Sequence, residues 1–204
     1  DYKYFTALKD LKVLQFSHFE LFDDQSIKYL STMTQLEVLH MTSMKKLHGS
    51  GFKDLLTATE NGEYQPVMPK LRILRLDWCK NLTDELFTHL QWFTSIQTFV
   101  TIDSDKLTDF HLLGKLVNLE ELRLNRVPFI TDDMIMEIAT NARNITKLHI
   151  NGANLKFNAN LTKKTLQAIS QLRQLQSLEL NEKTADRLLP INNPSSDFDT
   201  GRLQ

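Results

Sequence analysis

The chain has 204 residues, of which 41% are hydrophobic and 24% are charged, and its formal net charge at pH 7 is -1. These values are ordinary for a folded protein, and they exclude an overall charge that would attract the chain to nucleic acid or to an anionic membrane. The single cysteine excludes an internal disulfide, and no apolar run reaches the roughly 20 residues that span a membrane, so we expect an intracellular protein of the cytoplasm or nucleus.

The first predicted strand begins at Leu11, where LKVLQF places apolar residues at its first, fourth and sixth positions. The same spacing returns six times: LEVLHM, LRILRL, IQTFVT, LEELRL, ITKLHI and LQSLEL begin at Leu36, Leu71, Ile96, Leu119, Ile145 and Leu175. One such motif is weak evidence because leucine is common. Seven in order, with starts 23 to 35 residues apart, indicate an array of about seven structural repeats.

A turn and a short helix are predicted after each strand. Four of the helical segments follow a pair of hydroxyl or acidic residues: Asp23-Asp24, Thr83-Asp84, Thr108-Asp109 and Thr131-Asp132. Threonine and aspartate side chains accept hydrogen bonds from the free N–H groups of a helix's first turn, and aspartate also suits the positive end of the helix dipole. We therefore expect each pair to cap the helix that it precedes.

Stacking of neighbouring units is required, because one unit cannot bury both its strand leucines and its helix face. In the third unit Leu74 and Leu76 are expected to point inward and to pack against the equivalent residues of both neighbours, Leu39 with Met41 and Phe99 with Thr101. The predicted fold class is therefore α/β: a solenoid with a curved parallel sheet on its concave side and helices on its convex side.

The fourth unit, IQTFVTID, can be read in two registers. Either Phe99 and Thr101 point inward, or a slip of one residue places Val100 and Ile102 there instead, since a slip exchanges the two faces of a strand. The first register is preferred because it keeps Leu107 and the Thr108-Asp109 pair in phase with the other units.

Cys79 occupies a position that is filled in other units by Phe19, Met44, Ser104, Val127 and Ala153, so it is interpreted as a small buried packing residue and not as a reactive thiol. The second unit is longer by about ten residues near 60–69, ENGEYQPVMP. Its glycine and two prolines predict a loop that protrudes where the chain returns to the next strand, a tolerated insertion more than a binding loop.

The organisation predicted from these patterns is a solenoid over residues 1–182, followed by residues 183–204 as a C-terminal cap and flexible tail. The sixth unit is also long, with NGANLKFNANLT from Asn151 to Thr162. After Leu180 the repeat pattern stops, and the remaining sequence is polar and rich in Asn, Asp, Ser and Pro.

The stretch from Leu71 to Leu90, LRILRLDWCKNLTDELFTHL, resembles the cysteine-containing subclass of leucine-rich repeats, whose consensus is LxxLxLxxCxxITDxxLxxL. That subclass is typical of F-box/LRR substrate receptors of SCF-type ubiquitin ligases. The resemblance implies a protein target on the concave face, with a Skp adaptor and a cullin bound through an F-box outside this chain, since only DYKYFTA precedes the first repeat. The alternative is a non-catalytic scaffold subunit of a larger assembly, which could be nuclear and associated with nucleic acid.

No motif for catalysis, cofactor binding or metal binding is found. The sequence lacks GxGxxG, Walker-type and GxSxG segments, and its one cysteine and scattered histidines do not match a familiar zinc spacing. We therefore expect neither an enzyme nor a protein with a cofactor.

The candidate binding residues are those that alternate with the core positions and so face the concave side. Large, basic or polar side chains gather there in the middle units: His40, Arg75, Asp77, Trp78, Arg123, Asn125, Arg126, Lys147 and His149. Arginine and tryptophan are enriched at binding hot spots, and guanidinium groups pair well with carboxylate or phosphate oxygens. This pattern predicts capture of an acidic or phosphorylated protein segment, without direct contact to nucleic acid. Structural roles are preferred for the histidines. The alternative is that Trp78 packs over the strand edge and that the arginines are solvated.

Overall fold

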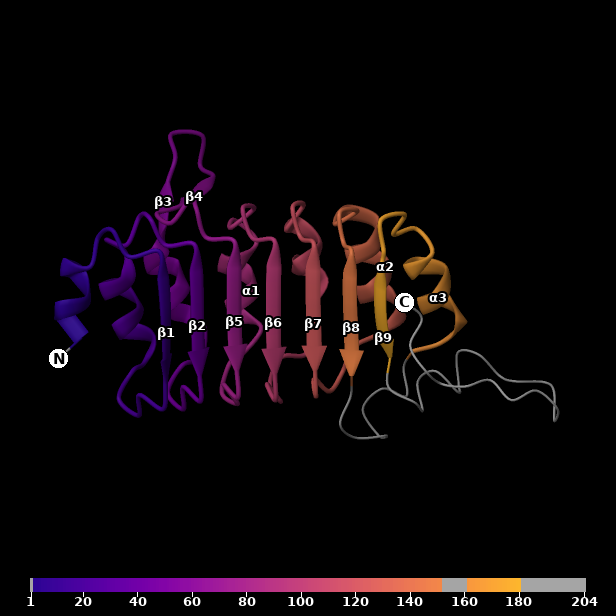
Figure 1. The fold of residues 1–204 in the computed structure, drawn as a ribbon, viewed down its shortest axis with the longest axis horizontal. Helices are drawn as coiled ribbons and strands as arrows, with labels where there is room; N and C mark the ends of the chain where they lie inside the picture. Colours follow the sequence, from indigo (N-terminus) through magenta and orange to yellow (C-terminus); the bar gives the residue numbers. More distant parts are fainter. Residues whose placement is uncertain (1, 152–160, 181–204) are drawn as a thin grey trace.

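A computed structural model of the chain describes residues 2–151 and 161–180. The extension predicted in the sixth unit and the predicted C-terminal tail lie largely outside these ranges. Seven parallel strands form one sheet in the order β1-β2-β5-β6-β7-β8-β9 (Figure 1). Their bounds are Val13–Ser17, Val38–Thr42, Ile73–Asp77, Thr98–Ile102, Glu121–Asn125, Lys147–Asn151 and Ser177–Leu180. Each strand begins two residues after the start of its sequence motif.

Helices lie behind the sheet as a second layer, and one follows each of the first six strands of the main sheet (Figure 1). Three are α-helices: α1 (Glu85–Leu90), α2 (Asp132–Asn141) and α3 (Lys163–Ile169). Four are 3₁₀ helices: η1 (Tyr2–Ala7), which precedes the first strand, η2 (Asp24–Leu30), η3 (Ser50–Leu55) and η4 (His111–Lys115). The α/β solenoid predicted from the repeats is confirmed. Because the strands alternate with short helices, one face of the sheet is covered and the other is open.

The strand register carries the core from one unit to the next. Leu74 pairs with Leu39 on one side and with Phe99 on the other, and all three side chains are fully buried. The same register settles the fourth unit: Phe99 is aligned with Leu74 and Thr101 with Leu76, so both point inward as preferred. A polar residue is tolerated there because Thr101 Oγ1 donates to the Leu76 carbonyl at 3.1 Å and lies 2.8 Å from Ser104 Oγ.

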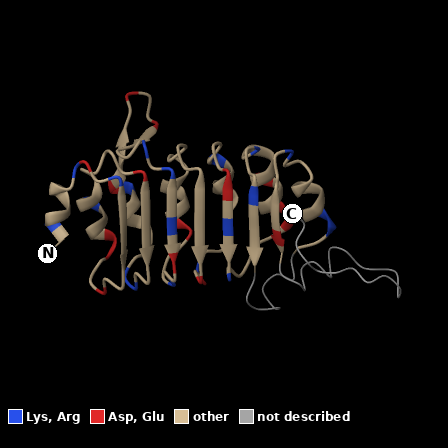
Figure 2. Cartoon of the chain, viewed as in Figure 1, with Lys and Arg blue, Asp and Glu red and all other residues tan. Residues whose placement is uncertain are grey.

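Charged residues within the sheet are confined to β5, β7, β8 and β9 (Figure 2). Strands β1, β2 and β6 carry none. The charged part of the open face therefore begins at the third strand of the sheet and is interrupted by the apolar strand β6.

The residue after each of five strands has a left-handed backbone conformation. The sequence did not indicate this, because none of these residues is a glycine. The residues involved have φ between 56° and 59°: His18, Ser43, Trp78, Asp103 and Arg126. In each case the N–H group donates to the last carbonyl of the next strand, as from Trp78 to Ile102 at 2.7 Å. The repeated interstrand bond offsets the strain that a side chain experiences in this conformation.

The insertion in the second unit is a β-hairpin, so the loop predicted at 60–69 contains a short strand at Tyr64–Pro66. Strands β3 (Leu56–Ala58) and β4 (Tyr64–Pro66) pair antiparallel in a separate two-stranded sheet that projects beyond the edge of the main sheet (Figure 1). Gly62, with φ of 79°, lies in the turn. The Tyr64 ring lies 5.7 Å from the Trp92 ring of the third unit, which ties the hairpin to its neighbour. The projection itself, at the place where the chain returns to the next strand, agrees with the prediction.

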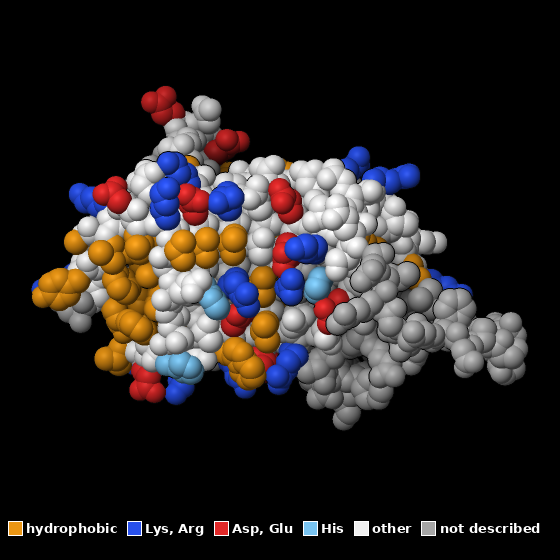
Figure 3. Space-filling model, in the orientation of Figure 1, with side chains coloured by type: hydrophobic (Ala, Val, Ile, Leu, Met, Phe, Trp, Pro, Cys, Tyr) orange, Lys and Arg blue, Asp and Glu red, His pale blue; other side chains and the backbone are white. Residues whose placement is uncertain are grey.

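The N-terminal end of the array exposes apolar side chains, visible as a continuous orange region at that end of the sheet (Figure 3). No residue of η1 is buried. Exposed large side chains gather in the first 21 residues: Tyr4, Leu8, Val13, Phe19 and Leu21. Behind them, rings of the first unit pack edge to face, as Phe16 does on Phe22 at 5.0 Å. This end of the solenoid is apolar, in contrast to its charged middle.

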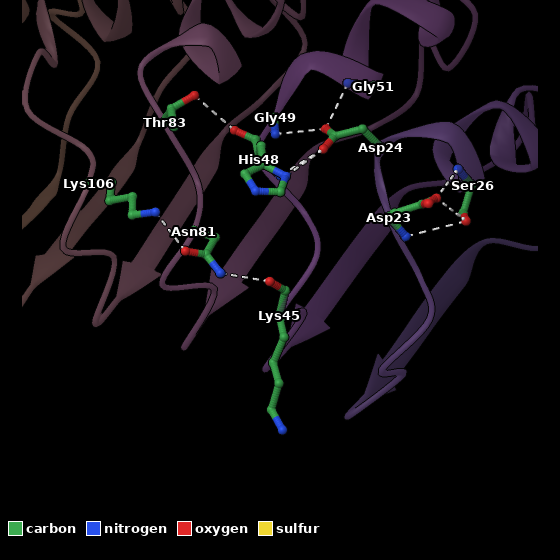
Figure 4. Close-up of polar contacts among 10 residues, drawn as sticks. All are labelled: Asp23, Asp24, Ser26, Lys45, His48, Gly49, Gly51, Asn81, Thr83 and Lys106. Carbon is green, nitrogen blue, oxygen red and sulfur yellow. Dashed lines mark hydrogen bonds and ion pairs between the residues drawn. The ribbon is translucent and has the colours of Figure 1, made fainter.

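Aspartates at the helix starts bind the next unit more than their own. Asp24 accepts hydrogen bonds from the backbone N–H groups of His48, Gly49 and Gly51 at 2.8 to 2.9 Å (Figure 4). In the same way Asp84 accepts from the N–H groups of Thr108 and Asp109 at 2.7 and 3.0 Å. These carboxylates therefore join consecutive units. The predicted caps would have stabilised only the helix that each carboxylate precedes.

The capping prediction is therefore only partly confirmed. Asp23 does cap η2, since it accepts from the Ser26 N–H at 3.0 Å, and Thr131 Oγ1 accepts from the Met134 N–H at 3.4 Å (Figure 4). Asp84 makes no side-chain bond to its own helix, and Asp132 binds Thr162 and Thr165 of the next unit. The Asp84 and Asp132 carboxylates point toward the next unit because the start of the helical segment there presents several N–H groups without an intrahelical partner.

Two of the three Asn-x-Thr sequences use their asparagine amides inside the array. Asn81 Nδ2 donates to the Lys45 carbonyl at 2.8 Å and its Oδ1 accepts from Lys106 at 2.8 Å (Figure 4). Asn144 Nδ2 donates to the Val117 carbonyl at 3.2 Å. The third, at Asn160, lies outside the described residues. Both described asparagines thus have a structural role between units.

Candidate functional site

The open face of the seven-stranded sheet, here called the strand face, corresponds to the predicted concave side. The register aligns Arg75, Val100, Arg123 and His149 in one row across β5 to β8. A second row holds Asp77, Ile102, Asn125 and Asn151. Neighbouring strands lie about 4.8 Å apart, so residues from four separate units form one surface.

Trp78, Arg126 and Asp103 form a contact across three strand ends. The Arg126 guanidinium lies over the Trp78 ring, 5.2 Å from its centroid, and Arg126 Nε lies 2.8 Å from Asp103 Oδ1. Trp78 remains 44% exposed, whereas Asp103 is only 4% exposed. The sequence predicted Trp78 and Arg126 on this face, but it did not indicate that Asp103 would be buried beneath them.

Asp77 is a second buried carboxylate on the strand face. Its Oδ2 lies 3.0 Å from Arg75 Nη2 and 3.0 Å from His40 Nε2, and the same His40 nitrogen lies 3.0 Å from Thr42 Oγ1. The Asp77 side chain is buried, so it orients Arg75 and His40 instead of meeting a partner itself. This placement corrects the expectation that Asp77 would be part of the exposed surface.

Arg123 and Lys147 share the carboxylate of Glu121 at the other end of the strands. Arg123 Nε is bonded to Glu121 Oε1, and Lys147 Nζ lies 3.6 Å from Glu121 Oε2. Glu121 is half-buried, and burial raises its pKa, but the bond from Arg123 and the charges of Arg123 and Lys147 outweigh this and lower the pKa overall. The sequence reasoning missed Glu121, although its register opposite Lys147 on the next strand was the signal that could have found it.

His149 pairs with Glu179, 2.8 Å from Nδ1 to Oε2, with the histidine largely buried and the glutamate exposed. The interaction joins β8 to β9, and His149 Nε2 lies 3.4 Å from Ser177 Oγ. The structural role preferred for this histidine from the sequence fits these contacts.

The basic residues predicted to form a patch are therefore all paired with carboxylates. In the pairs of β5 to β8 the cations lie outside: side-chain exposure is 41% for Arg75, 38% for Arg123 and 47% for Arg126, against 7% for Asp77 and 6% for Asp103. In Figure 3 blue and pale-blue side chains cross the middle of this face, with hydrophobic side chains between them. The strand face therefore exposes the cationic ends of its side chains, although its total charge is close to zero.

An apolar floor lies between the cationic groups. The register puts Val100 between Arg75 and Arg123, and Ile102 between Asp77 and Asn125. Val100 is 2% exposed and Ile102 is partly exposed. Strand β6, which lacks charged residues, supplies this apolar floor. Guanidinium groups from β5 and β7 lie on both sides of it.

Several polar atoms of this face have no partner within residues 2–151 and 161–180. The buried unpaired atoms of the strand face are Arg75 Nε, Asp77 Oδ1, Asp103 Oδ2 and Asn125 Oδ1. Buried polar groups are paired in the great majority of native structures, so a cluster of four is unusual. These four atoms are the part of the hydrogen-bonding capacity of the strand face that the described residues do not use.

The described residues offer little for catalysis. Cys79 is fully buried, and burial raises the pKa of its thiol to about 11, with hydrogen bonds from Met44 and Ser43 opposing the rise and the Asp77 charge adding to it. Across the two described ranges, no group of three or more His, Cys, Asp or Glu side chains is placed to hold a metal ion. Nor does any helix there have the length and apolar character needed to cross a membrane.

No protein-family model and no curated protein matches the chain. Solved structures do. An internalin (inlF) from Listeria monocytogenes shares 15% identity over 88% of this chain and 51% of its own, with a TM-score of 0.55. Internalin C2 from the same organism shares 15% identity over 90% of this chain and 80% of its own, with a TM-score of 0.52. The chain thus spans about half the length of the first of these structures.

Yeast Rad7, solved in a complex with Elc1, shares 14% identity over 88% of this chain and 66% of its own, with a TM-score of 0.44, which is too low to carry an inference. The two internalins are leucine-rich-repeat proteins, and their similarity establishes the leucine-rich-repeat solenoid fold. At this identity it leaves the ligand of the strand face open.

Proposed function

We propose that this chain is a non-catalytic binding module that captures a protein segment on its strand face. The observation that carries this proposal is the exposed Trp78 ring with the Arg126 guanidinium stacked on it, at the ends of the three middle strands of the sheet. Tryptophan and arginine dominate the energetics of protein interfaces when they sit centrally beside apolar surface. Ile102 and the Arg75 guanidinium complete such a centre here.

The solenoid architecture supports the same reading. Parallel strands place side chains from separate units in rows, and a surface of this kind suits an extended segment or a folded partner.

Within this function, we propose the role of substrate-recognition domain in an F-box-type SCF ubiquitin ligase receptor. The support is the resemblance of LRILRLDWCKNLTDELFTHL to the cysteine-containing leucine-rich repeats of such receptors. A Skp adaptor and a cullin would then bind through an F-box outside this chain. The amides of Asn81 and Asn144, engaged between units, fit a protein of the cytoplasm or nucleus that is not glycosylated.

The test is affinity purification of the full-length native protein, compared with its Trp78→Ala and Ile102→Ser variants. We expect specific partners that are lost from both variants, and a Skp adaptor and cullin that are retained by all three proteins. Partners that are unchanged by both substitutions would contradict capture on the strand face. Absence of the adaptor and cullin from the wild-type sample would contradict the ligase role alone.

A second candidate is a scaffold subunit of a larger assembly. The specific observation in its favour is the pair of surfaces away from the charged middle of the strand face: the exposed apolar N-terminal end and the projecting hairpin of β3 and β4. Apolar patches of this kind often mark protein contacts. Replacement of residues 59–63 by a two-residue turn, together with Tyr64→Ser, would then release partners that Trp78→Ala retains.

A further inference from the structure

The strand face exposes cations and conceals their counter-charges. Arg75, Arg126, Arg123 and Lys147 have side-chain exposures from 38% to 49%, whereas the three carboxylates that pair with them range from 6% to 19%. A ligand that approaches β5 to β8 therefore meets guanidinium and ammonium groups first. This asymmetry could not be seen in the sequence, where both signs of charge occur at neighbouring positions.

Each arginine at the Trp78 end of the face uses only part of its hydrogen-bonding capacity. Arg75 donates a hydrogen bond to Asp77 through Nη2, and Arg126 forms an ion pair with Asp103 through Nε. A guanidinium carries five N–H donors in a fixed plane, so both groups retain donors for a second acceptor. Carboxylate and phosphate oxygens fit such planar donors well.

The buried carboxylates also hold these donors in position. Asp77 and Asp103 lie beneath the guanidinium groups, and Trp78 supports Arg126 from the side. A side chain that is already oriented loses less conformational entropy when it binds. The carboxylates therefore reduce the overall charge of the site while they prepare its donors for contact.

Between these donors, Ile102 is partly exposed in the row that joins Asp77 to Asn125, next to the exposed Trp78. An aliphatic side chain can pack on this strip while a neighbouring anionic group reaches Arg75 or Arg126.

We propose that the protein segment captured on the strand face carries an anionic group beside an aliphatic residue, with the anion bound by Arg75 and Arg126 and the aliphatic side chain packed on Ile102 and Trp78. This inference rests on the proposed function and specifies its ligand. The anionic oxygens come from glutamate or aspartate, or from a phosphorylated serine. Four cations face three carboxylates in β5 to β8, so the binding depends only weakly on salt, in contrast to the steep salt dependence of binding to nucleic acid.

Trp78 provides the readout. The chain has two tryptophans, so in a Trp92→Phe protein the emission reports on Trp78 alone. Four peptides are titrated into the full chain. Each has one central leucine, with two identical residues on each side of it: glutamate, glutamine, lysine or phosphoserine. We expect the glutamate peptide to bind about tenfold more tightly than the glutamine peptide, as charge-assisted contacts do. Comparison of the phosphoserine peptide with the glutamate peptide then shows whether the site prefers a phosphate or a carboxylate group.

Arg75→Gln and Arg126→Gln should each weaken the acidic peptide by about fivefold or more and leave the glutamine peptide unchanged. Arg143→Gln is the matched control, because Arg143 is exposed near the end of α2 and away from the strand face. Asp103→Asn combined with Arg126→Gln repeats the test without a buried unpaired charge, in case the single variant does not fold.

Equal binding of the glutamate and glutamine peptides, preference for the lysine peptide, or no binding of any peptide would overturn the inference. The proposed function fails separately: it is contradicted when Trp78→Ala and Ile102→Ser leave capture of native partners unchanged. Loss of native partners from those two variants, together with no effect of Arg75→Gln and Arg126→Gln, would retain the strand face and reject the anionic ligand.

Discussion

The guanidinium of Arg126 lies over the Trp78 ring, with 5.2 Å from its central carbon to the ring centroid. The contact joins the ends of β7 and β5 and passes over Asp103 at the end of β6, which pairs with the same arginine at 2.8 Å. Three units of the solenoid thus meet in one contact. The arginine serves both the exposed ring and the buried carboxylate, so its removal has effects on stability as well as on binding.

Replacement of Arg126 by Gln is expected to lower the free energy of unfolding by about 1–3 kcal/mol, because the buried Asp103 carboxylate loses its counter-charge. Urea unfolding followed by circular dichroism measures the change. The Asp103→Asn/Arg126→Gln double variant removes both charges and should recover most of the loss. Equal destabilisation of the single and double variants would show that the pairing contributes little.

Replacement of Asp132 by Ala should cost about 2–3 kcal/mol, since the carboxylate accepts hydrogen bonds from backbone and hydroxyl groups of Thr162 and Thr165 in the next unit. Asp133→Ala is the matched control, because Asp133 is the adjacent aspartate and is exposed. We expect a change within about 0.5 kcal/mol for the control. Chemical denaturation of both variants checks the difference, and similar values for the two would rule out the interunit role.

Acid should destabilise the array through the same carboxylates. Burial raises the pKa of Asp24 and of Asp132, but hydrogen bonds from the next unit outweigh it, so both folded-state pKa values lie below the ordinary value of 3.8. A lowered folded pKa contributes stability above the unfolded pKa, and this contribution is lost as the pH falls below about 4. Urea midpoints from pH 7 to pH 2.5 measure the loss. An Asp132→Asn protein should show a shallower decline, and an unchanged decline would contradict this assignment.

The Cys79 thiol should be inert in the folded protein. It is fully buried and its pKa is raised to about 11, so very little thiolate forms near neutral pH. A thiol reagent at pH 8 is expected to label it only in denaturant, with one thiol per chain. Rapid labelling of the native protein, with unfolding monitored in parallel, would show that the second and third units open locally.

Substitution of Gly51 by Ala should destabilise the protein by about 3 kcal/mol, because the new Cβ would clash with the Asp24 carbonyl oxygen and force η2 and η3 apart. Gly62→Ala in the hairpin turn is the comparison. It meets no atom within 4 Å and should cost only about 1 kcal/mol for its positive φ. Thermal melts of the two variants compare them directly, and a neutral Gly51→Ala would show that η2 and η3 can separate without loss.

The repeat itself was determined by the sequence. Apolar residues at the first and fourth positions of seven motifs, and at the sixth position of six of them, were enough to locate the strands, their register and the buried Cys79, because a periodic core demands the same spacing in every unit. Even the uncertain fourth unit followed from keeping Phe99 in phase with its neighbours.

Only the tertiary structure decided which charges meet. Asp24, Asp84 and Asp132 looked like caps of their own helices, yet they bind the next unit, and Arg75 and Arg126 looked like a free basic patch, yet buried aspartates hold them. Local sequence specifies the polarity of a position, but the partner of a side chain depends on which residues stacking brings beside it from another unit. The hydrogen-bonding and charge pattern of the strand face is therefore a property of the stack of units.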